Sequence, residues 1–120
     1  MEWNLEDGRP IWSQLAQQLT RRIITGVYPP GSRLPPVREL AAEAGVNPNT
    51  MQRALAQLEQ DGLAKADRTA GRLVTQDAGI LDRVRREEAQ AIIRQYLDAM
   101  AALGFTRERA ASFLREEEST

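Results

Sequence analysis

The chain of 120 residues contains no cysteine and no histidine. It can therefore form no disulfide, and it lacks the usual ligands of a zinc site and the thiolate or imidazole of most catalytic sites. No Gly-rich phosphate loop and no nucleophile elbow occurs in the sequence. The paired carboxylates at 87–88 and 116–118 fit solvated helix faces or tails. We expect no metal, no cofactor and no enzymatic activity.

Long apolar runs are also missing. No segment approaches the roughly 20 apolar residues that a membrane-spanning helix needs. The first residues, Met1-Glu2-Trp3-Asn4, lack the basic and then apolar regions of a signal peptide. We expect no membrane partner and a cytoplasmic location.

Positive charge is carried almost entirely by arginine, since Lys65 is the only lysine among 16 basic residues. Residues 1–76 hold nine basic and eight acidic residues (+1), whereas residues 77–120 hold seven and nine (−2). Arginine suits bidentate contacts with phosphate and guanine, although the bias also follows from genome composition. The net charge of −1 disfavours a non-specific nucleic-acid binder.

The first half of the chain has the pattern of three helices. Apolar residues recur every four positions from Ile11 to Ile23 and predict a helix that begins near Pro10 and ends by Gly26. Its glutamines and arginines (14, 17, 18, 21 and 22) fall largely on the other side. A second helix is expected from Val37 to Ala44.

Gly45 is a natural end for the second helix, and Asn47 followed by Pro48 is a good start for a third. Apolar residues at 51, 54, 55 and 58 form one face of this third helix, with polar residues opposite. Two helices joined by a short Gly-containing turn form a helix-turn-helix, whose second helix can lie in the DNA major groove. DNA binding is therefore the leading hypothesis.

A short hairpin is expected after the third helix. Its strands are Leu63–Ala66 and Arg72–Thr75, joined by the five residues 67–71. A two-stranded hairpin is marginal by itself, so it must pack against the helices.

The character of the chain changes beyond Gln76. One long helix is predicted from Ile80 to Leu103, and a last helix from Thr106 to about Arg115, followed by a frayed acidic tail. We expect two domains, 1–76 and 77–120. The apolar positions of the second part favour a dimer or domain interface over a ligand site, namely Leu81, Val84, Ile92, Tyr96, Met100, Phe113 and Leu114.

Spaced Gly, Pro, Arg and Leu positions over residues 10–76 resemble the GntR family of bacterial transcription regulators. The matching residues are Tyr28-x-Pro30-Gly31-x-x-Leu34-Pro35-x-x-Arg38-x-Leu40-Ala41, Gly45-Val46, and Ala54-Leu55-x-x-Leu58-x-x-x-Gly62-Leu63. The short C-terminal part and Asn47-Pro48-Asn49-Thr50 are similar to the YtrA subfamily. Many relatives have Ser at Pro36, where this chain loses a helix cap.

The resemblance implies a mainly α fold with a small β-hairpin wing, that is, a winged helix-turn-helix followed by a two-helix dimerisation segment. It implies a homodimeric regulator, expected to be a repressor, on a double-stranded DNA operator with inverted repeats. A transporter operon is the target by analogy. The residues expected to contact DNA are Arg38, Asn47, Asn49, Thr50, Gln52, Arg53, Arg68, Gly71 and Arg72.

The sequence is compatible with two alternatives. The near-neutral charge also fits a winged-helix adaptor that binds a partner protein and no DNA. The second alternative concerns a small-molecule effector, which the sequence does not identify: two short helices cannot enclose a ligand within one protomer, so an effector site would lie between protomers. Thr50 is expected to bind phosphate with help from backbone N–H groups at the start of its helix.

Overall fold

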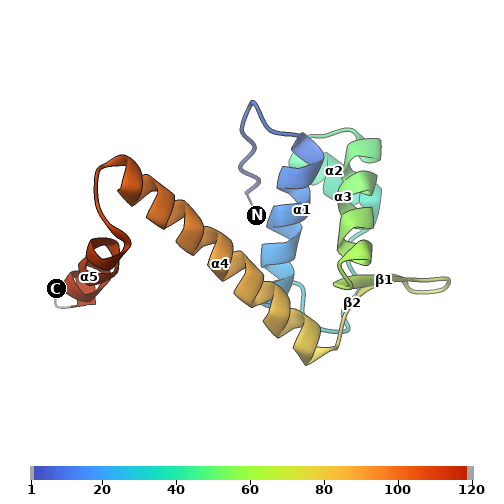
Figure 1. Cartoon of the computed structure of the whole chain (residues 1–120). Coiled ribbons are helices and arrows are strands. Elements are labelled where there is room, and N and C mark those ends of the chain that lie inside the picture. The colour runs from blue at the N-terminus through green and yellow to red at the C-terminus, as the bar shows by residue number, and fades with distance from the viewer. Residues whose placement is uncertain (1, 119–120) are drawn as a thin grey trace. The chain divides into compact units, whose positions relative to one another are not determined.

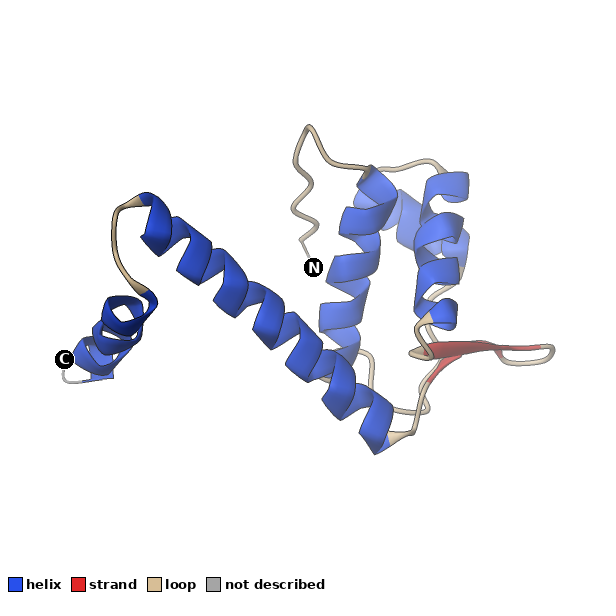
Figure 2. Cartoon of the chain, in the orientation of Figure 1, coloured by secondary structure: helices blue, strands red, loops and turns tan. Residues whose placement is uncertain are grey.

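The computed structural model describes residues 2–118, within which the chain forms five helices and one antiparallel two-stranded sheet (Figure 1). The elements in chain order are α1 (Ile11–Ile24), α2 (Val37–Ala44), α3 (Pro48–Gln60), β1 (Ala64–Asp67), β2 (Gly71–Val74), α4 (Ala78–Ala102) and α5 (Arg107–Glu118). Figure 2 shows how small the sheet is beside the helices, which confirms the predicted mainly α fold with a hairpin wing. Within the described residues, no helix has the length and apolar character needed to cross a membrane.

The chain forms two compact units, Met1–Arg83 and Val84–Thr120. The first turns of α4 belong to the first unit: a side chain at Gly62 would lie 3.5 Å from Ile80, and Arg83 donates to the carbonyl of Asp61 at 3.5 Å. The sequence predicts a boundary at Gln76, between a DNA-binding domain and a dimerisation segment. This functional division stays a prediction.

The core of the first unit is built by apolar residues of α1, α2 and α3, together with Leu34 before α2 and Leu63 after α3. The predicted periodicity accounts for most of it, because residues four positions apart share one helix face. The large side chains buried there are Leu15, Leu19, Ile23, Leu34, Leu40, Met51, Leu55, Leu58 and Leu63.

The expectation that the polar residues of α1 face solvent is wrong for Gln14 and Arg22, which are only 2% and 8% exposed. Residues 2–9, here called the N-terminal arm, run along this side of α1 and bond to it. Each buried polar atom of the described side chains has a hydrogen-bond partner, as burial in a low-dielectric interior requires.

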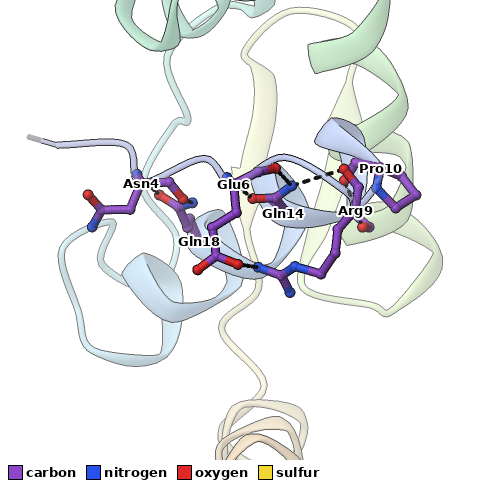
Figure 3. A network of polar contacts seen from close by, with 7 residues as sticks. Asn4, Glu6, Arg9, Pro10, Gln14 and Gln18 are labelled. Atoms are coloured by element: carbon purple, nitrogen blue, oxygen red, sulfur yellow. Dashed lines mark hydrogen bonds and ion pairs between the residues drawn. The ribbon is translucent and has the colours of Figure 1, made fainter.

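Two glutamines of α1 hold the backbone of the arm (Figure 3). Gln14 accepts from the N–H of Glu6 at 2.7 Å and donates to its carbonyl at 2.8 Å. Gln18 does the same with Asn4, at 3.1 and 2.7 Å. Four residues of helix rise about 6 Å and two residues of extended chain span about 6.6 Å. The spacings agree, so the two side chains pair with alternate residues of the arm.

Arg22 joins the arm to α1 and α2. Its guanidinium lies 3.9 Å from the ring centroid of Trp3 and donates to the hydroxyl of Tyr28 at 3.1 Å. It also forms an ion pair of 3.5 Å with Glu43, which accepts the indole N–H of Trp3 at 3.2 Å. A buried cation thus has both a counter-ion and an aromatic face.

The hairpin pairs Ala64 with Val74 and Asp67 with Gly71. Its loop is the three residues 68–70, and the predicted five-residue loop is therefore wrong. Gly71 has φ +79°, and a glycine in this left-handed conformation closes a three-residue hairpin loop. Residues 31–34 flank β2, with the N–H groups of Gly31 and Leu34 donating to β2 carbonyls at 2.9 Å.

Helix α4 begins and ends within two residues of the predicted helix. The N-cap expected for α5 is confirmed, because the hydroxyl of Thr106 accepts from the N–H of Arg109 at 3.1 Å. The prediction of a frayed tail is wrong for Glu116 and Glu117, because both residues lie in α5. Glu116 forms an ion pair of 2.8 Å with Arg109. Ser119 and Thr120 lie outside the described residues.

Candidate nucleic-acid interface

The turn between α2 and α3 consists of residues 45–47. Gly45 has φ +70° and ends α2 in the left-handed conformation, which glycine adopts without a steric penalty. Asn47 is the N-cap of α3: its side chain accepts the N–H of Asn49 at 2.7 Å. Pro48 takes the first helical position, where no N–H partner is needed. The predicted helix-turn-helix is present.

The third helix has one buried and one exposed face. The buried side consists of Met51, Ala54, Leu55 and Leu58, all fully buried. The exposed side, here called the α3 outer face, consists of Asn49, Gln52, Arg53, Ala56 and Gln60. Anchoring by the buried side fixes the helix, so the outer face is presented to solvent as a rigid polar surface.

Several residues expected to contact DNA have unoccupied side-chain donors. Within residues 2–118, the side chains of Arg38, Gln52 and Arg68 make no hydrogen bond or ion pair. Arg38 lies in the first turn of α2 and Arg68 in the loop of the wing, and both are exposed. Free N–H donors on three separate elements can each meet an acceptor on a partner.

Arg53 of the α3 outer face is held by a residue of another helix. Its guanidinium carbon lies 4.2 Å from the ring centroid of Trp12, in the first turn of α1. Trp12 is half-buried and Arg53 exposed. Trp12 and Tyr28 both lie at the edge of the core, each against an arginine.

The start of α3 offers fewer free groups than the sequence suggested. Asn47 uses its side-chain oxygen as the cap, and its carbonyl accepts from the N–H groups of Thr50 and Met51 at 3.0 and 3.1 Å. These amides are therefore already bonded within the chain, and the expected help of backbone N–H groups in phosphate binding stays a prediction. The side chain of Thr50 is half-buried.

Arg72 differs from the other predicted arginines. It forms an ion pair with Glu59 of α3, and its side chain is only 20% exposed. The pair ties β2 to α3, and it takes up one of the five N–H donors of the guanidinium. Among the two wing arginines, we therefore rank Arg68 above Arg72 as a DNA contact.

The tip of the wing is organised by Asp67. Its carboxylate accepts three hydrogen bonds of 2.9 Å, from the N–H and the hydroxyl of Thr69 and from the N–H of Ala70. The bonds from Ala70, and then those from Thr69, hold the pKa of Asp67 below its ordinary value of 3.8. Asp67 is thus a structural residue, and it places a negative charge beside Arg68.

Arg33 is a candidate that the sequence reading missed. It is exposed, its backbone forms a bridge with Leu73, and a side chain at Gly71 would come within 3.3 Å of its Nε. Arg33 therefore lies beside the wing tip. It belongs to a turn-rich connector without helix or strand periodicity, so only the fold shows its position.

The second unit carries an apolar groove. Ile92 is 51% exposed and Leu114 is 54% exposed, and with Ile93, Leu97 and residues of α5 they line a hollow of about 600 Å³. Tyr96 donates to the carbonyl of Ala110 at 2.6 Å and closes α5 onto α4. Of the predicted interface residues, Tyr96, Met100 and Phe113 are half-buried, Val84 is buried and Leu81 half-buried.

A family model described as bacterial regulatory proteins, gntR family, matches residues 12–74. This range runs from Trp12 to the end of the wing and holds the whole helix-turn-helix. The chain belongs to the GntR family. Its members are DNA-binding transcription regulators, which favours that function over the adaptor hypothesis.

Similar proteins extend the match beyond the winged helix. The chain is 32% identical over 108 residues to YhcF of Bacillus subtilis (strain 168), an HTH-type transcriptional regulator, covering 90% of this chain and 89% of that protein. It is 38% identical over 69 residues to the HTH-type transcriptional repressor YtrA of the same organism, covering 58% and 53%.

A solved GntR family transcriptional regulator from Listeria monocytogenes has the same fold. It superposes with a TM-score of 0.84 at 30% identity and covers 93% of this chain and 98% of its own. The helical C-terminal part is thus shared with another GntR regulator, and the predicted fold class is confirmed.

Proposed function

We propose that this GntR regulator is a homodimeric repressor that reads an inverted-repeat operator with the α3 outer face. The observation that carries the proposal is the combination of a buried apolar side of α3 with exposed donors that no other part of residues 2–118 uses. Because these donors have no partner within the described chain, they can bind a ligand without first breaking an internal hydrogen bond.

The residue types on the outer face suit the reading of base edges. Asn49 and Gln52 carry amides that donate and accept at once, which matches the N6 and N7 positions of adenine. Arg53 has the forked donors that match guanine. Because Ala56 adds a small apolar side chain, a thymine methyl group fits beside it.

Arginines on the flanking elements suit the phosphate backbone. Arg38 of α2 precedes α3 in the sequence, and Arg68 of the wing follows it. Within residues 2–118, neither guanidinium group has a hydrogen-bond or ion-pair partner. Contacts of this kind set the position of a protein on DNA without reading sequence. They also release counterions, so we expect binding to weaken steeply as salt rises.

The apolar groove of the second unit supports the dimer. Exposed Ile92, Ile93 and Leu114 form an apolar surface that a second copy would remove from water. Two-fold symmetry would then present two α3 helices to half-sites about 34–36 Å apart, one turn of DNA.

Repression follows from occupying a promoter and obstructing polymerase. The similar Bacillus subtilis YtrA is named a repressor, which supports this sign of regulation over activation. We place the protein in the cytoplasm with the DNA, and the resemblance to the YtrA subfamily favours a transporter operon as the target.

The test is selection of bound fragments from the source genome, followed by footprinting. We expect fragments with a two-fold symmetric footprint whose halves lie one helical turn apart. Sedimentation of the free protein at micromolar concentration should give twice the mass of the chain. Recovery of no fragment above background would refute sequence-specific binding, and a footprint without symmetry would refute the dimeric arrangement.

A further inference from the structure

The contact between Trp12 and Arg53 joins two residues that the sequence separates by 41 positions. Trp12 lies in the first turn of α1 and Arg53 in the middle of α3. The ring is anchored, because Trp12 is half-buried and α1 packs on α3. The guanidinium lies over that ring at 4.2 Å, a distance typical of a cation–π contact.

The ring contact is made by the guanidinium of Arg53 as a whole, through the attraction between a cation and the face of an aromatic ring. Arginine has five N–H donors in a fixed planar fork. Within residues 2–118, Arg53 makes no hydrogen bond or ion pair in addition to the ring contact. All of its donors are therefore available to a ligand at the α3 outer face.

The stack also reduces the number of conformations of a long side chain. Free arginine loses considerable side-chain entropy when it is fixed by a partner. A side chain that is already held in one orientation loses less on binding, which strengthens the contact without adding an interaction. Arg38 and Arg68 have no such support within the described residues.

We propose that Trp12 is a positioning residue for DNA recognition: its indole ring holds Arg53 so that the guanidinium edge points to the DNA. The inference rests on the proposed DNA contact of Arg53. It adds a residue of α1, outside the helix-turn-helix, to the determinants of affinity. The opposite role, in which the ring withholds Arg53 from DNA, predicts tighter binding when the ring is removed.

The experiment is a double-mutant cycle in operator affinity with Trp12→Leu, Arg53→Ala and the double variant. Trp12→Leu should weaken binding about two- to fivefold, the factor that matches cation–π energies at exposed sites. Trp12→Phe keeps a ring and should recover most of the affinity. In the Arg53→Ala background, Trp12→Leu should have no further effect. Circular dichroism and urea unfolding confirm that each variant is folded.

Each result has a defined meaning. Equal loss from Trp12→Leu with and without Arg53 would show a structural role and overturn the inference. Unchanged or tighter binding of Trp12→Leu would overturn it too, as would unchanged binding of Arg53→Ala. If wild-type protein binds no DNA in a salt-sensitive way, the proposed function fails, and this outcome is distinct from the others.

Discussion

Arg72 of the wing forms an ion pair with Glu59 of α3, although 13 positions separate the two residues in the sequence. The pair gives the two wing arginines different roles. Arg72 connects β2 with α3, whereas Arg68 at the tip has free donors within the described chain.

Substitution of Arg72 should therefore lower stability, and substitution of Arg68 should lower DNA affinity. Arg72→Ala leaves the partly buried Glu59 without its partner, and we expect a loss of about 1–2 kcal/mol in the free energy of unfolding. Arg68→Ala is the matched control and should leave the urea midpoint unchanged. An unchanged midpoint for Arg72→Ala would show that the ion pair is not structural.

The carboxyl group of Asp67 at the wing tip should titrate below its ordinary pKa. Its pKa is lowered in the folded chain, so the charged form contributes stability above the unfolded value of about 3.8, and this contribution is lost as pH falls through the lower folded pKa. The amide resonances of Thr69 and Ala70 should therefore titrate below pH 3.8. In Asp67→Asn this transition should be absent. A midpoint at or above 3.8 would contradict the three hydrogen bonds.

Removal of the Gln14 side chain should release the N-terminal arm. Gln14 makes three hydrogen bonds to the arm, two with Glu6 and one to the carbonyl of Arg9 at 3.1 Å. Gln14→Ala should lower the free energy of unfolding by roughly 1–3 kcal/mol and speed hydrogen exchange of the Glu6 amide. Gln17→Ala, one turn away and without such bonds, is the control. Equal losses of unfolding free energy in the two variants would refute the claim that the Gln14 side chain holds the N-terminal arm.

Charge in the apolar groove should weaken the proposed dimer. Ile92 is about half exposed in the single chain, so Ile92→Asp should leave the helices intact and disfavour only the association. Sedimentation velocity should show a shift toward monomer, with Gln95→Asp on the same helix as the control. A dimer that survives Ile92→Asp would place the interface elsewhere.

The helices and the turn could be predicted because local rules determine them. Pro48, Asn47 and Gly45 act through backbone chemistry within a few residues, and the structure agrees there. The apolar spacing of α3 likewise gave its buried face correctly. Pro36 starts α2 without a side-chain cap, as its sequence predicts.

Other features depend on contacts distant in sequence. Gln14 and Arg22 were expected outside because hydropathy gives no sign that the arm covers them. The pairing of Arg72, the stacking of Arg53 and the position of Arg33 depend on how the wing and α1 pack. Residue type alone indicates a basic surface, whereas the fold decides which donors remain free.

The most direct test of the central claim is the affinity of the selected operator for wild type, Arg38→Ala and Gln52→Ala over a series of salt concentrations. Arg21→Ala, an exposed arginine in the last turn of α1, controls for loss of charge. Arg38→Ala should weaken binding and reduce the slope of log affinity against log salt by about 1, whereas Gln52→Ala should cost about 1–3 kcal/mol at one base pair. Affinities equal to wild type for both variants would contradict reading of DNA by the α3 outer face.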